Sequence, residues 1–174
     1  MIGDHSAKRA SEEASKIWAI DSAQYPLNGG ALIQGHIEVA AIDSVTEMSV
    51  HGRRALEGWN IKENIYLQQK RWKWAPIKNA PIVTELRDAF NRVLHAQDLV
   101  VGFEKRPEST CVIDGGSIVI PYLMARTDRR PTSYIDLFSM AHAWLHGALP
   151  AIHKIDPKAA QQGGAPDAFG AGDC

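Results

Sequence analysis

The sequence predicts an α+β fold, in which a small antiparallel or mixed sheet packs against helices. Three observations predict this fold class. Several segments space their apolar residues three or four apart, as amphipathic helices do, while others alternate apolar and polar residues, as strands do. Asp114, Gly115 and Gly116 separate two apolar runs and predict the turn of a hairpin. The chain has 174 residues, which is enough to bury the core of one domain.

The N-terminal part predicts two helices and one strand. Residues 5–19 favour a helix with a mixed-charge face, and the Asn-Gly-Gly cluster within 24–30 predicts a turn. Residues 35–42 favour a strand because apolar residues alternate there with polar or small ones, although a helix over the same run remains an alternative. Residues 43–58 predict a short helix that ends near Gly58.

The middle of the chain predicts a strand followed by a helix. Residues 64–77 alternate apolar and cationic side chains, and Pro76 ends that run. Residues 81–96 predict an amphipathic helix with Pro81 in its first turn, because the apolar residues fall on one stripe.

A sheet is predicted next. The run 99–104 favours a strand, and residues 111–113 and 118–120 favour the two strands of a hairpin. Cys111 falls in the first of these strands and is expected to be a small core residue rather than a nucleophile.

The C-terminal helix is predicted over residues 133–146. Ser133 and Asp136 form a capping-box pattern at its start, Gly147 closes it, and Pro150 lies just beyond. The residues from 151 to 174 are rich in Gly, Ala and Pro and predict a flexible tail.

Two histidines in this helix carry the chemistry of the site. His142 and His146 stand four apart, so both imidazoles lie on one helix face and can reach one zinc ion at about 2.0–2.1 Å. This is the ligand spacing of the zinc-peptidase motif H-E-x-x-H, but Ala143 occupies the position of the glutamate that acts as general base. Losing such a base typically costs about 10²–10⁴ in rate. Asp156 and His153 are the weak candidates for a third ligand.

The order of these segments resembles the zincin-like peptidase domain of ArdC-type antirestriction proteins, which plasmids and phages carry. The matching stretches are NAPIVTELRDAFNRVLHA, CVIDGGSIVIPY and YIDLFSMAHAWLHG, and the resemblance covers about residues 60–147. It implies a zincin-like core over residues 61–150, preceded by a helical and strand region over residues 1–60. It also implies bound Zn²⁺, a protein or peptide substrate, and an N-terminal region that binds single-stranded DNA. The family's third ligand is an acidic residue on a following helix, which this chain does not match.

Ala143 leaves three interpretations open. The alanine is natural and the chain is a pseudoenzyme, or it is an inactivating substitution of a glutamate. In the third, the histidine pair is structural, with His142 bonded to a backbone carbonyl and His146 near a helix C-terminus, where a cation is favoured.

A second class of function follows from a run of tryptophans and cations. Indole rings can stack on unpaired bases while cations meet phosphates, so a non-enzymatic accessory protein that binds nucleic acid or another protein is the alternative to the metal site. The residues concerned are Lys70, Arg71, Trp72, Lys73 and Trp74. The competing interpretation is an amphipathic strand whose tryptophans are core. Arg126, Arg129 and Arg130 either extend a basic surface or form a solvated loop.

The amino-acid composition excludes few classes of function. Lys and Arg number 19 and Asp and Glu 20, so the overall charge does not favour nucleic acid, although a local patch remains compatible with it. The two cysteines make no disulfide framework. No apolar run is long enough to span a membrane, and the polar N-terminus lacks the features of a signal peptide, so we expect a cytoplasmic protein.

Overall fold

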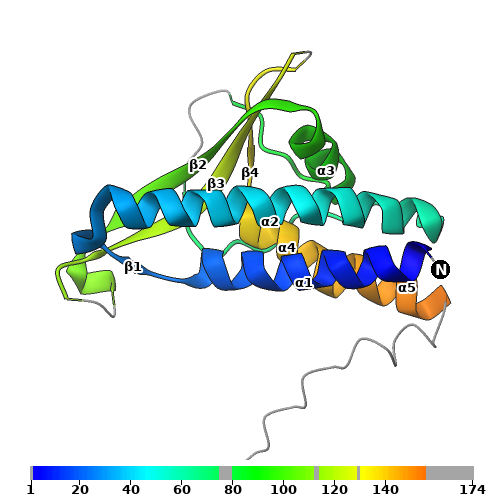
Figure 1. The fold of residues 1–174 in the computed structure, drawn as a ribbon, viewed down its shortest axis with the longest axis horizontal. Helices are drawn as coiled ribbons and strands as arrows, with labels where there is room; N and C mark the ends of the chain where they lie inside the picture. The colour runs from blue at the N-terminus through cyan, green and yellow to red at the C-terminus, as the bar shows by residue number, and fades with distance from the viewer. Residues whose placement is uncertain (1, 75–79, 112–113, 129, 156–174) are drawn as a thin grey trace, which may run out of the picture.

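Two long antiparallel helices, α1 (Ile2–Ser22) and α2 (Gly30–Gly58), form the base of the fold (Figure 1). The computed structural model describes residues 2–74, 80–111, 114–128 and 130–155. The two helices meet through small and apolar side chains at helical spacing, which lets their backbones approach closely. The buried members include Ala7, Ala10, Ala14 and Ile17 of α1 and Ala41, Val45, Met48 and Ala55 of α2.

Helix α2 corrects the predicted strand over residues 35–42, and the helical alternative is the right one. Ile37 and Ala41, four apart, are buried, while Val39 between them is 60% exposed. A strand would place all three on one face, whereas a helix separates Val39 from the other two. The predicted helix end at Gly58 is confirmed.

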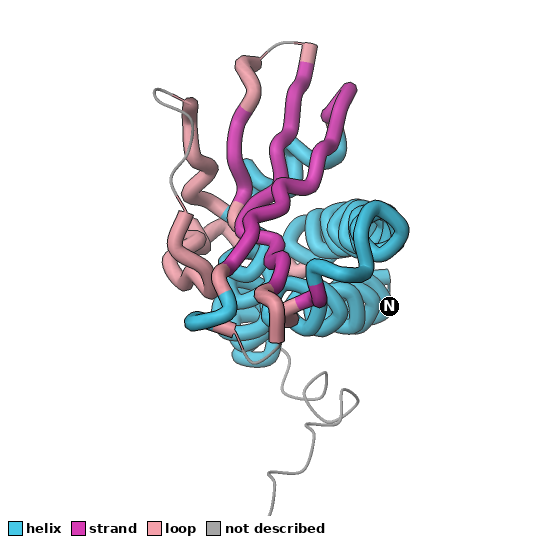
Figure 2. The backbone as a smooth tube through the Cα atoms, turned by 90° about the vertical axis from the view of Figure 1, so that its left-hand side faces the viewer, coloured by secondary structure: helices cyan, strands magenta, loops and turns pink. Residues whose placement is uncertain are grey.

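The sheet is antiparallel and has β3 (Ser117–Thr127) at its centre. Strand β2 (Ala96–Arg106) pairs along one side of β3, while β1 (Tyr25–Pro26) and β4 (Ser133–Ile135) pair at opposite ends of its other side. Figure 2 shows helices on one side of the sheet and loop segments on the other. The α+β prediction is therefore confirmed, with the sheet in its antiparallel form.

The hairpin differs from the predicted one. Its strands are β2 and β3, and the short helix η2 (Glu108–Thr110) follows β2. Val112 and Ile113 lie outside the described residues, while Cys111 is half-buried beyond any strand, with its Sγ 2.9 Å from Ser117 Oγ.

The run 64–77 also differs from its predicted structure. Its described part, up to residue 74, contains one isolated bridge, between Tyr66 and Glu85, and no strand. Helix α3 (Leu86–Leu94) begins later than predicted, because residues 81–85 are extended. Their backbone pairs with β4 instead, since Tyr134 N donates to Pro81 O and Val83 N donates to Tyr134 O, both at 2.9 Å.

The helix that carries the histidines consists of α4 (Leu137–Ala143), a π-helical turn η3 (Trp144–Ala148) and α5 (Leu149–Ile155). Residues 133–135 form β4, so the predicted start at Ser133 is wrong. The N-cap is Asp136, whose Oδ1 accepts a hydrogen bond of 2.8 Å from Ser139 N.

Gly147 does not end this helix. A Cβ at Gly147 would lie 2.8 Å from a methyl group of Ile65, so the glycine serves close packing. Pro150 cannot donate to the carbonyl four residues before it, that of His146, and this carbonyl lies within the π turn that precedes the proline. The predicted tail therefore begins too early, since residues 151–155 are helical and Ile152 is buried.

Within the described ranges, no helix is long and apolar enough to cross a membrane.

Candidate functional site

The two histidines lie side by side against helix α1. His142, from α4, is half-buried and His146, from η3, is exposed, and their ring centroids are 4.5 Å apart with planes at 33°. Trp18 of α1 stacks on His142 at 5.8 Å and 21° and also meets His146 at 5.7 Å. Phe138 completes this aromatic cluster, with its ring 4.4 Å from that of Trp18.

The surroundings of His142 favour its neutral form. Burial lowers the pKa of His142, and the neighbouring His146 lowers it further. A neutral imidazole has a free lone pair, which is the form that binds a divalent metal. The His142 side chain is therefore in its metal-binding form at neutral pH.

The donor set fits a metal only in part. Two imidazoles one helical turn apart suit zinc or another divalent ion of the first transition row. Among the residues that the structure describes, however, no group of three or more His, Cys, Asp or Glu side chains is placed to hold an ion. His153 lies on α5 and forms no such group with the pair, and Asp156 lies outside the described residues.

Ala143 faces the core rather than the histidine side of the helix. It is 5% exposed and belongs to the main apolar cluster, beside the fully buried Trp144. A glutamate at position 143 would thus bring its carboxylate into an apolar environment, away from the histidine face.

The interpretation of the histidine pair as purely structural placed His146 near a helix C-terminus, and the structure differs on this point. Helix η3 continues directly into α5, so His146 lies inside a longer helical run rather than near its C-terminal end. Both imidazole rings contact aromatic side chains and each other.

Two buried acids lie beside this cluster, at the end of α1 and the start of α4. Asp21 is 2% exposed, and its Oδ1 has no hydrogen-bond partner in the described structure. The pKa of Asp21 is raised to about 8, mainly by burial and then by the charge of Asp136, against the opposing effect of Arg71. Burial also raises the pKa of Asp136, against the hydrogen bonds from Trp74 and Ser139 and the charge of Lys70.

Asp21 is the site residue that sequence reasoning missed, although a signal was present. The buried stripe of α1 runs through Ala7, Ala10, Ala14 and Ile17, and Asp21 is the next position at that spacing. A carboxyl group on an apolar stripe is unusual and marks a buried polar contact.

The predicted nucleic-acid-binding residues form what we call the tryptophan segment, residues 70–74. Its indoles donate to the acids at the helix ends: Trp72 Nε1 to Asp21 O at 2.6 Å and Trp74 Nε1 to Asp136 Oδ2 at 3.0 Å. Both indole rings are half-buried, and Trp74 packs against Tyr122 at 4.9 Å. The structure thus joins this segment to the buried acids.

The cations of the segment lie over its own rings. Lys70 Nζ is 4.8 Å from the Trp74 ring centroid and the Arg71 guanidinium is 5.0 Å from that of Trp72. Lys73 is exposed, and its carbonyl oxygen accepts a hydrogen bond of 2.9 Å from Arg106. These cation–π contacts occupy the ring faces that a nucleic-acid base would need.

No protein-family model matches the chain, and comparison with curated proteins and with solved structures finds no match either.

Proposed function

We propose that this chain is a zincin-like domain that binds a divalent metal, with zinc as the first choice, at His142 and His146 and lacks peptidase activity. The observation that carries the proposal is the pair of adjacent imidazole rings, whose centroids lie 4.5 Å apart, with His146 exposed and the pKa of His142 lowered by burial. The ArdC-type resemblance points the same way, towards a mobile-element origin and a cytoplasmic location.

The chain's own residues position the pair. Trp18 and Phe138 hold the His142 ring against α1, and the π turn places His146 on the outer side of the helix. A zinc ion held there would supply a Lewis acid. The two imidazoles would hold it. Asp156 is the candidate for a third protein donor, and a separate variant tests it.

The lack of a general base supports a non-catalytic role. Ala143 is buried and carries no proton acceptor. Asp136 caps α4 and accepts from Trp74, while Asp21 is buried with a pKa raised to about 8, so neither carboxyl group is free to take a proton from solvent beside the histidines. The burial of position 143 favours a natural alanine, because a native glutamate there would need a polar surrounding.

Zinc titration by calorimetry, with elemental analysis of the dialysed protein, tests this proposal. The background is Cys111→Ser with Cys174→Ser, since thiols also bind zinc. We expect about one zinc per chain, with binding lost in His142→Ala with His146→Ala. His153→Ala is the matched control and keeps binding. If Asp156 supplies the third donor, Asp156→Asn weakens zinc binding.

Quenching of tryptophan fluorescence by Cu²⁺ adds a test of position. Trp18 is the indole that touches both imidazoles, so quenching falls in Trp18→Phe and in the double histidine variant. Zinc binding that survives in the double histidine variant, or the absence of binding at millimolar zinc, contradicts the proposal.

A further inference from the structure

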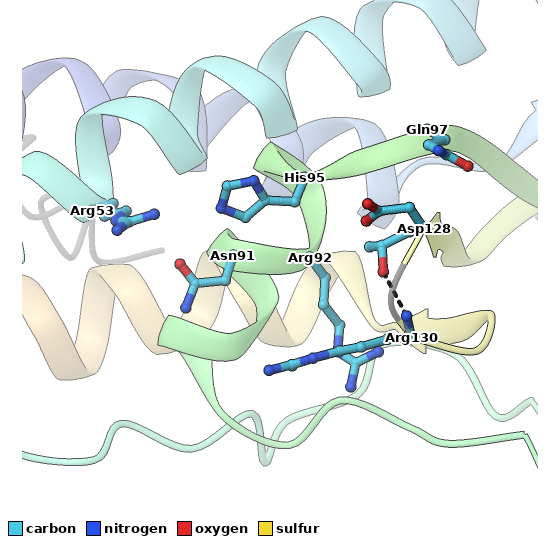
Figure 3. Close-up of a pocket in the computed structure, with 8 residues that line it drawn as sticks. Arg53, Asn91, Arg92, His95, Gln97, Asp128 and Arg130 are labelled. Carbon is cyan, nitrogen blue, oxygen red and sulfur yellow. Dashed lines mark hydrogen bonds between the residues drawn. The ribbon is translucent and has the colours of Figure 1, made fainter.

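A cavity of about 700 Å³ lies where α3 ends, β2 begins and β3 ends, and Arg53 of α2 also lines it (Figure 3). Its lining brings together side chains from four separate parts of the chain. They are Arg53 of α2, Asn91 and Arg92 of α3, His95, Gln97 of β2, and Arg130 after β3. No residue of α1 or α4 lines it, so this cavity is separate from the histidine pair.

Two of its arginines share one carboxylate. Arg92 Nε lies 2.9 Å from Asp88 Oδ2, and Arg130 Nη1 lies 2.7 Å from Asp88 Oδ1. A single negative charge thus faces two guanidinium groups, which leaves one positive charge uncompensated within this trio. The pairing also fixes both arginines at the cavity wall.

Arg92 retains unused hydrogen-bonding capacity. Its side chain is 13% exposed, and its Nη1 has no hydrogen-bond partner in the described structure. A buried guanidinium N–H without a partner is costly, so a rotation of the Arg92 side chain that brings Nη1 to an oxyanion in the cavity would be favourable. Arg53 adds a third guanidinium from α2, held through its Nε to Glu57 at 2.9 Å.

Polar groups complete the cavity. The pairing of β2 with β3 is irregular between Ala96 and Asp98, so Gln97 is an extra residue, and such a bulge re-aims the side chain, here into the lining. The Asn91 amide lies on the α3 side, and the Asp128 carboxylate lies opposite. Arg130 N donates to Thr127 Oγ1 at 3.0 Å, which ties down the loop that carries Arg130.

The geometry points to a site for a phosphate-bearing small molecule of nucleotide size. Guanidinium groups bind phosphate through paired N–H donors, and the cavity volume is within the usual range for small-molecule sites, about 300–1,000 Å³. The amides and the Asp128 carboxylate suit a ligand that also carries hydroxyl or amino donors, as a sugar or base does. A nucleoside monophosphate is therefore expected to bind more tightly than inorganic phosphate.

The test is calorimetric titration of the full chain with AMP and with inorganic phosphate. Arg53→Gln and Arg130→Gln remove guanidinium groups from the open edges of the site, and each is expected to weaken AMP binding by about tenfold to a hundredfold. Arg126→Gln is the matched control, because Arg126 is an exposed arginine of the same strand end that pairs with Asp98 and does not line the cavity. It keeps the affinity of the unmodified chain.

Competition identifies where the phosphate comes from. Failure of a ten-residue oligothymidylate to displace AMP supports a free nucleotide as the ligand, whereas displacement assigns the phosphate to a nucleic-acid backbone and overturns the small-molecule part. No binding of AMP at millimolar concentration, or binding that Arg53→Gln and Arg130→Gln leave unchanged while circular dichroism shows an intact fold, overturns the site itself.

Discussion

The indole ring of Trp18 stacks on the imidazole ring of His142, with centroids 5.8 Å apart and planes 21° apart. The two residues come from the first and the fourth α-helix, so this contact joins the N-terminal helix pair to the helix that carries the histidines. It also supplies part of the burial that lowers the pKa of His142. The protonation of the candidate metal ligand therefore depends on a residue near the other end of the chain.

Trp18→Ala is expected to raise the pKa of His142 towards its ordinary value, because removing the indole exposes the imidazole to water. The loss of ring packing on Phe138 and His142 is expected to lower the free energy of unfolding by about 1–3 kcal/mol. Proton NMR titration of the histidine side chains measures the first effect and urea unfolding the second. An unchanged His142 titration would show that the indole does not shield the ring.

Ala143→Glu is expected to lower the free energy of unfolding by about 3 kcal/mol or more and to leave the chain without peptidase activity. Position 143 is 5% exposed, so the new carboxyl group would lose its hydration without gaining a partner. Urea unfolding and a casein-cleavage assay with zinc measure the two effects.

The control for that prediction is Ala19→Glu, at an exposed position of α1, which is expected to change the free energy of unfolding by less than about 0.5 kcal/mol. If Ala143→Glu is as stable as the unmodified chain and cleaves protein with zinc, then the alanine is an inactivating substitution and the non-catalytic proposal is wrong.

The predictable part of the fold is the part that local patterns determine. The helix over residues 5–19 is confirmed within α1, and the strand 99–104 is confirmed within β2. The apolar residues of the run 35–42 fit both the two-residue repeat of a strand and the four-residue spacing of a helix. Only the burial of Ile37 and Ala41 in the folded core decides between the two. Likewise, the partner of β3 is set by tertiary pairing, which a turn signal at Gly115 and Gly116 does not determine.

The local part of the candidate metal site was likewise predictable from the sequence. The spacing of His142 and His146 placed their rings on one helix face, because that relationship is local. Trp18 reaches them only through the packing of α1 on α4, which no spacing indicates. The arginine cavity shows the limit most clearly, since Arg53, Arg92 and Arg130 come from three segments far apart in the sequence, and no local pattern indicates that these segments meet.

Asp21 is expected to make the protein less stable as the pH rises from about 4 to about 8. Its pKa in the folded chain is raised to about 8, so the folded state retains a proton that the unfolded state releases near pH 4. The contribution is fully present below the unfolded pKa and is lost through this window, with a slope of up to about 1.4 kcal/mol per pH unit. The raised pKa of Asp136 acts in the same direction.

Asp21→Asn removes this dependence and is expected to be more stable than the unmodified chain at pH 8 but not at pH 4. The charged groups that act on Asp21 are Asp136 and Arg71, and Tyr25, whose pKa is raised by burial and by Asp21, is a neutral titratable neighbour. Urea unfolding at pH 4, 6 and 8 measures the effect, with Asp43→Asn, at an exposed position of α2, as the control. Parallel pH profiles for Asp21→Asn and the unmodified chain would show that folding does not raise the pKa of Asp21.

Trp72→Ala separates a structural role of the tryptophan segment from the nucleic-acid-binding alternative. Trp72 donates to Asp21 O at 2.6 Å, and its ring is covered by Arg71 and Arg106 at 5.0 and 5.8 Å. We therefore expect Trp72→Ala to lower the free energy of unfolding by about 2 kcal/mol. We expect little effect on the affinity for a fluorescein-labelled oligothymidylate, measured by anisotropy at low and high salt. Lys73→Ala, which removes an exposed cation and leaves the indoles in place, is the control for charge alone. A salt-dependent affinity that collapses in Trp72→Ala, in protein that remains folded, would instead identify this segment as a stacking platform for unpaired bases.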